Sequence, residues 1–120
     1  MITLEIPRAP ASPNNFLGKH WRFRYRNSQV WQQEVNVALL QAGHTKRVPF
    51  QKARITIHRR GRRELDPDNL VGSVKPVIDA LRYAQVLVDD SPAHLELEVT
   101  QSYSHKLPPR TLIKIQPINV

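Results

Sequence analysis

The sequence contains no cysteine, which excludes disulfide bonds and any zinc or iron–sulfur centre held by thiolates. No apolar run approaches the ~20 residues of a transmembrane helix, and residues 1–10 lack the basic-then-apolar pattern of a secretory signal. Repeats, low-complexity tracts and long linkers are missing as well. We therefore expect a cytoplasmic protein with no membrane partner, whose residues 1–120 form a single domain.

Acidic residues are also scarce. Ten Asp and Glu stand against 18 Lys and Arg, which gives a formal net charge of +8 and a pI near 10.5. Such a surface attracts polyanions at long range, and nucleic acid is the commonest of them. A basic protein that docks on an acidic partner protein has the same charge, so the net charge leaves both possibilities open.

The cations gather in two clusters, which we expect to bind DNA phosphates. The first contains Arg22, Arg24 and Arg26, with Lys19 and His20 just before them. The second contains Arg59, Arg60, Arg62 and Arg63. The second cluster continues directly into the acidic segment 64–68. Cations beside grouped carboxylates are suited to holding a phosphate near a metal ion.

Hydrophobic periodicity predicts the elements of the first half. Alternation predicts strands over 2–6 and 53–58. Residues 14–27 are basic and are expected to form a loop or ribbon. A helix is expected from an N-cap at Ser28, with its apolar face around Trp31, Val35 and Leu39 and a stop at Gly43.

The second half is expected to hold one helix and two strands. Asp66-Pro67 resembles a helix start, and apolar residues follow at helical spacing as far as Leu81. Pro76 should kink this helix, with Gly72 absorbing some of the strain. Strands over 95–100 and 112–118 should pair as a hairpin. The expected fold is α+β, a small mixed sheet of about four strands with two packed helices, in the order β-α-β-α-β-β.

Residues 21–26 alternate strictly between aromatic side chains and arginines. In an extended conformation all three rings would lie on one face and all three arginines on the other. The arginines would then face either solvent or DNA phosphates. A stacking platform for splayed bases is a third possibility.

Carboxylates flank the predicted second helix. Asp66 and Asp68 stand at its start, and Asp89 and Asp90 follow it. A straight helix of about 17 residues would hold the two pairs ~25 Å apart. They meet only if the chain after Leu81 doubles back or if Asp66 lies on the strand side of the helix start.

If the carboxylates meet, they suit Mg²⁺ or Mn²⁺, which prefer oxygen ligands and retain waters. Such a metal would polarise a phosphate and lower the pKa of a bound water. Lys75, on nearly the same helical face as Asp68, would stabilise charge on the phosphoryl oxygens. In the alternative interpretation Asp66 and Asp68 only cap a helix and Asp89-Asp90 is a solvated turn.

Four short segments together resemble the RusA family of Holliday junction resolvases. They are Asp66-Pro67-Asp68-Asn69-Leu70, Lys75, Asp79-Ala80-Leu81 and Val88-Asp89-Asp90, in that order. Pro13-Asn14-Asn15, the basic stretch after it and the chain length are similar as well. The resemblance implies one RusA-like endonuclease domain that acts in DNA recombination and repair. It matches Asp66, Asp68 and Asp90 to catalytic, metal-binding aspartates, and Lys75 to the essential lysine.

Three functions therefore remain open from the sequence. They are a Mg²⁺-dependent endodeoxyribonuclease that resolves four-way junctions, a non-catalytic basic nucleic-acid-binding module, and a protein that docks on an acidic partner. Resolution needs two nearly symmetric cuts, so the first function predicts a homodimer with two sites. The apolar side of the first helix, around Trp31 and Leu39, and the acidic segment itself are the interfaces considered.

Overall fold

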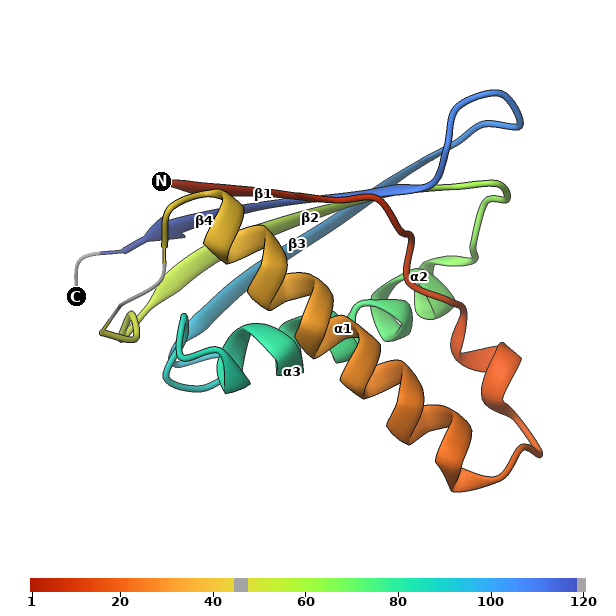
Figure 1. Ribbon diagram of the computed structural model, residues 1–120, viewed down its shortest axis with the longest axis horizontal. Helices are drawn as coiled ribbons and strands as arrows, with labels where there is room; N and C mark the ends of the chain where they lie inside the picture. Colours follow the sequence, from red (N-terminus) through yellow and green to blue (C-terminus); the bar gives the residue numbers. More distant parts are fainter. Residues whose placement is uncertain (45–47, 119–120) are drawn as a thin grey trace.

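Four strands form one mixed sheet, and the helices cover one of its faces (Figure 1). The computed structural model describes residues 1–44 and 48–118. The elements are β1 (Ile2–Ile6), the 3-10 helix η1 (Pro13–Phe16), α1 (Trp21–Gln41), β2 (Ala53–Gly61), α2 (Pro67–Ser73), α3 (Lys75–Tyr83), β3 (Leu95–Tyr103) and β4 (Arg110–Pro117). The expected α+β class is confirmed, with α2 and α3 together taking the place of the second helix.

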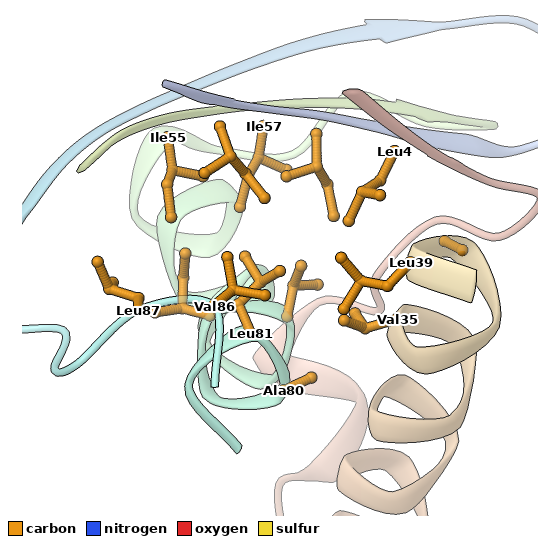
Figure 2. Packing of buried hydrophobic residues seen from close by; sticks show 14 of the residues in the cluster. Leu4, Val35, Leu39, Ile55, Ile57, Ala80, Leu81, Val86 and Leu87 are labelled. Carbon is orange, nitrogen blue, oxygen red and sulfur yellow. The ribbon is translucent and has the colours of Figure 1, made fainter. Parts of the chain in front are cut away.

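The core lies between the sheet and the helices α1 and α3 (Figure 2). Ile55 and Ile57 point from β2 toward Val35 and Leu39 of α1 and Leu81 of α3, and all five are fully buried. Complete burial of such a side chain stabilises the fold by about 1.5–3 kcal/mol. The period-two and helical spacings predicted these inward faces correctly.

The sheet order is β1-β4-β2-β3, so the predicted hairpin between the last two strands is wrong. β3 pairs in parallel with β2, and β4 runs antiparallel between β1 and β2. Ile113 and Ile115 of β4 are completely buried, as a central strand requires. Glu96 and Glu98 make β3 more polar, and charged side chains are typical of an edge strand.

The first helix begins at Trp21, seven residues before the expected N-cap at Ser28. His20 is the N-cap, and its Nδ1 accepts a hydrogen bond from the Arg22 amide at 3.2 Å. The expected loop or ribbon over 14–27 is therefore η1 followed by the first turns of α1, and arginines and rings are not sorted onto two faces. No helix among the described residues is long and apolar enough to cross a membrane.

The second helix breaks instead of kinking. α2 ends at Ser73, Val74 lies between the helices, and Pro76 occupies the first turn of α3, where its missing N–H is tolerated. Gly72 has a different function from the expected relief of strain. A Cβ at Gly72 would lie 2.8 Å from Cγ of Pro13, so glycine is what lets η1 approach α2.

Candidate active site and nucleic-acid interface

Lys75, Asp79 and Asp90 form a connected ionic cluster at the start of α3. The Lys75 ammonium donates hydrogen bonds to Asp90 Oδ2 at 2.7 Å and to Asp79 Oδ1 at 3.0 Å. Asp90 follows α3 in the sequence, so the chain must fold back along that helix to reach its first residue. This is one of the two arrangements in which the acidic pairs could approach each other.

The return of the chain is held by a turn and a short bridge. Gln85 has a φ of 62°, a left-handed conformation that reverses the chain after α3. The Phe50 amide donates to the Val86 carbonyl at 2.9 Å, and the Val88 amide donates to the Phe50 carbonyl at 3.2 Å. Because Val86 and Leu87 are also buried in the core, the backbone leading to Asp90 is anchored.

The ion pair shifts the pKa of both partners. The hydrogen bond from Lys75 lowers the pKa of Asp90, although partial desolvation opposes this. The hydrogen bonds to Asp90 and Asp79 raise the pKa of Lys75. The Lys75 ammonium thus lies between the side chains of Asp79 and Asp90, and it is still largely accessible to a ligand.

Asp66 and Asp68 lie at the start of α2 and are both exposed. Asp66 occupies the N-cap position, where the Leu70 amide donates to its backbone carbonyl at 2.8 Å. Within the described part of the chain, its carboxylate makes no capping hydrogen bond. The position fits the capping interpretation, but the side chain does not perform that function, so its oxygens can accept another ligand.

The backbone before Asp66 is held by Gln101 of β3. The Leu65 amide donates to Gln101 Oε1 at 3.0 Å, and Gln101 Nε2 donates to the Leu65 carbonyl at 2.8 Å. This two-way bond fixes the segment that enters α2. Sequence reasoning missed Gln101, because nothing in a strand pattern distinguishes a glutamine that reaches a distant loop.

The return of the chain leaves only α2 between the Asp66–Asp68 start and the contact of Asp90 with Lys75. α2 has seven residues, which corresponds to ~10 Å of helix between the Asp66–Asp68 start and the junction where Lys75 and Asp90 meet. Even so, among residues 1–44 and 48–118 no three His, Asp or Glu side chains are gathered tightly enough to hold a metal ion. The carboxylates fit Mg²⁺ in donor type, while Asp90 is engaged by Lys75 in this arrangement.

A hollow of about 730 Å³ opens beside Asp66. Its polar lining combines guanidinium and amide groups with the carboxylates of Glu64 and Asp66. The cationic and amide residues are Arg8, Arg59, Arg62, Arg63, Asn14, Asn15 and Asn69. Asn14 and Asn15 come from η1, which packs on α2. Guanidinium and amide donors around a carboxylate can hold a phosphate next to that carboxylate.

The second arginine cluster does not form one surface. Arg59 is buried, and its guanidinium donates to the Pro10 and Arg63 carbonyls at 2.9 and 3.3 Å. Arg60 lies on the opposite side of β2 and donates to the Pro108 carbonyl at 3.0 Å. A Cβ at Gly61 would collide with the Arg59 guanidinium. Arg59 therefore joins two loops, which corrects its expected position on the DNA-binding surface, and Arg62 and Arg63 remain exposed.

The first cluster is distributed around the exposed start of α1. Arg24 lines a hollow of about 290 Å³ together with Lys75 and Asp79, between α1 and the α2–α3 junction. Arg22 and Arg26 lie on another side of the helix and share a shallow depression with Phe23. The structure thus brings Arg24, but not the other two, next to the ionic cluster.

Asp79 is the other residue to which the sequence analysis gave no function. Its four-residue spacing from Lys75 is the usual separation of an ion pair on a helix, so a signal was present.

Comparison with protein-family models found no match, and a search of curated proteins found no relative. The fold and site therefore define an α+β domain with a cationic, carboxylate-bearing face.

Proposed function

We propose that this protein is a Mg²⁺-dependent endodeoxyribonuclease that resolves Holliday junctions, as its resemblance to the RusA family implies. One observation carries the proposal. The chain after α3 returns so that Asp90 contacts Lys75 at the junction of α2 and α3, about two helical turns from Asp66 and Asp68. The Asp66–Asp68 start is thereby separated from the contact of Asp90 with Lys75 by the seven-residue helix α2 alone.

The side chains of this region can each contribute to phosphodiester hydrolysis. Asp66, Asp68 and Asp90 would hold Mg²⁺ or Mn²⁺, which polarises a phosphate and lowers the pKa of a bound water. Lys75 can stabilise negative charge on a phosphoryl oxygen, because its ammonium already binds carboxylate oxygens in the same place. Arg24, Arg62 and Arg63 would hold neighbouring phosphates.

The most direct test is to incubate a labelled four-way junction with the protein, with and without Mg²⁺. Asp68→Asn and Asp90→Asn should retain junction binding and reduce cleavage by about 100-fold or more, because they remove ligands and leave the arginines in place. Glu98→Gln, an exposed carboxylate on β3, is the matched control and should cut normally. Loss of binding as severe as loss of cutting, with the fold intact, would contradict the catalytic assignment.

The non-catalytic nucleic-acid-binding module remains the alternative. It explains the arginines and the hollow. It does not explain why the Asp66 side chain makes no capping hydrogen bond or why Asp90 contacts Lys75. Junction binding without Mg²⁺-dependent cleavage would favour it. A basic protein that docks on an acidic partner would bind neither a junction nor a duplex.

We also propose that the active form is a homodimer in the cytoplasm. One chain has one acidic region, whereas resolution requires two strands of like polarity to be cut. Trp31 and Leu39, considered above as an interface, are buried inside the chain and are not available for one. The acidic segment stays exposed.

A further inference from the structure

The first two turns of α1 project from the domain with their aromatic side chains in solvent. Figure 1 shows this end of α1 extending away from the sheet. Trp21 is 63% exposed, Tyr25 55% and Phe23 48%. Burying such rings stabilises a fold or a complex more than burying most other side chains does, so three exposed rings on two turns indicate a surface that binds something.

Trp21 and Tyr25 form one continuous edge of this helix. They are four residues apart, and their ring centroids are 6.2 Å from each other. His20 extends the edge at 5.2 Å from Trp21, and Gln29 donates to the Tyr25 hydroxyl at 2.8 Å. Arg22 lies 5.9 Å from the centre of the Trp21 ring. The rings thus form a row in which Trp21 and Tyr25 meet edge to face, and the Arg22 guanidinium lies over the Trp21 ring.

The charge of the segment selects the kind of partner. Residues 7–33 contain five Lys and Arg and no Asp or Glu. A second copy of the same surface would bring like charges together, which opposes self-association through it. An anionic membrane would favour rings and cations on separate faces of the helix. In this helix rings and cations are mixed on the same side, because the Lys19 ammonium lies 5.3 Å from the centre of the Phe23 ring, away from Trp21.

We propose that the row of Trp21 and Tyr25 stacks on unpaired DNA bases while Arg22 and Arg26 bind the flanking phosphates. Rings stack well only on bases that are not covered by a neighbouring pair, so this surface would recognise single-stranded or opened DNA more than intact duplex. The inference rests on the nucleic-acid binding of the proposed function and not on catalysis. It identifies which feature of a branched substrate the protein contacts outside the carboxylate region.

The test measures DNA binding in EDTA, so that cleavage cannot contribute. A labelled oligothymidylate of about 20 nucleotides is long enough, because one OB fold, another small single-strand-binding domain, covers ~4–16 nucleotides. Trp21→Ala and Tyr25→Ala should each weaken its binding at least about fivefold, while Trp21→Phe retains most of the affinity. The affinity of these variants for a blunt duplex of the same length should equal that of the wild type. Equal losses on both DNAs, or no loss on the single strand, would overturn the proposal.

A matched control is provided by Tyr83 at the end of α3. It is 61% exposed and has the Arg82 guanidinium 5.2 Å from its ring centre, much like the arrangement at Trp21. Tyr83→Ala should not change single-strand affinity. A comparable loss would show that any exposed ring on this protein contributes, which contradicts a dedicated row.

Tryptophan fluorescence gives an independent readout, because Trp31 is buried and Trp21 is exposed. Oligothymidylate should quench the emission of the wild type and not that of Trp21→Phe. If Trp21→Ala abolishes a dimer seen by light scattering without affecting DNA binding, the partner is a second copy and the proposal is wrong. If it abolishes binding to phosphatidylserine vesicles without affecting DNA binding, the partner is a membrane and the proposal is wrong as well. If the wild type binds no DNA, the proposed function fails as well. A loss of stacking alone would leave junction cleavage intact.

Discussion

At the scale of single residues, the link between Lys75 and Asp90 is the contact on which the site depends. It connects the start of α3 to a residue fifteen positions later, and it explains both the lowered pKa of Asp90 and the raised pKa of Lys75. Solvent screens the pair, because the Lys75 side chain is mostly exposed. We therefore expect it to organise the site more than it stabilises the fold.

The pair predicts a pH-dependent contribution to stability. Because the folded pKa of Asp90 is depressed, the contribution is present above the ordinary carboxyl pKa of about 3.9 and is lost as the pH falls through the folded value. On the alkaline side it is lost as the pH rises through the raised pKa of Lys75. Lys75→Met should cost up to about 1 kcal/mol at neutral pH and nothing in acid, measured by urea unfolding. Lys114→Met, on a strand position between Thr3 and Thr56, is the control. A cost that is equal at both pH values would contradict the ion pair.

Gln101 provides a second prediction at the residue scale. Gln101→Met keeps the size of the side chain and removes both hydrogen bonds to Leu65. Stability should fall by about 1–3 kcal/mol, because the Leu65 backbone groups lose their partners in a partly buried place. Junction cleavage should fall more than junction binding, since Asp66 is the next residue. Gln116→Met on β4 controls for the loss of an exposed glutamine, and an unchanged Gln101→Met protein would show that Leu65 is held in some other way.

At the scale of elements, the close contact of η1 with α2 is what carries the N-terminal loop to the site. The 3-10 helix supplies Asn14 and Asn15 to the hollow beside Asp66, and Pro13 lies against Gly72. The break between α2 and α3 has a related consequence. It places Lys75 at the start of a new helix, where Asp90 of the returning chain contacts it.

Gly72→Ala tests this contact. Alanine would gain about 1 kcal/mol of helix propensity, but the added Cβ would meet the proline ring at 2.8 Å and cost about 1–3 kcal/mol. We expect a net loss of stability, measured by thermal or urea unfolding. In a Pro13→Ala background the ring is gone, so the same glycine substitution should become neutral or stabilising. Destabilisation of equal size in both backgrounds would contradict the proposed contact.

At the scale of the whole molecule, the sheet is open at both edges. β1 and β3 are the edge strands, while the helices cover one face and leave the other to polar side chains such as Arg54 and Glu96, which pair at 3.0 Å. Cations lie on both faces, but Arg24, Arg62 and Arg63 line the hollows beside α1 and the α2 start, next to the carboxylates. A junction would therefore meet the helical side of the domain.

The proposed homodimer is the prediction at this scale. Light scattering at micromolar concentration should give twice the mass of one 13.9 kDa chain. The physical reason is that two symmetric cuts need two acidic regions at a fixed separation. A strictly monomeric protein that still makes paired cuts on one junction within a single binding event would show the argument to be wrong.

The sequence by itself determined the inward faces of the elements and the fold class. The alternation around Ile55 and the helical spacing of Val35 and Leu39 reflect burial, which is a local property of each element, so they could be predicted. The net charge and the order of Asp66, Asp68, Lys75 and Asp90 likewise required no structure. They favour the nuclease function proposed above.

Only the tertiary structure decided which of these residues meet. Three contacts join positions more than 35 residues apart in the sequence. They are the pairing of β4 with β2, the hydrogen bond from Arg59 to Pro10 and the hydrogen bonds between Gln101 and Leu65. The start of α1 at Trp21 was misjudged because alternating rings and arginines suit a strand, while the capping His20 gives only a weak local signal. Asp90 reaches Lys75 because Val86 and Leu87 are buried in the core, which fixes the path of the chain after α3. This packing involves residues from several elements, so the pattern within one helix or strand does not predict it.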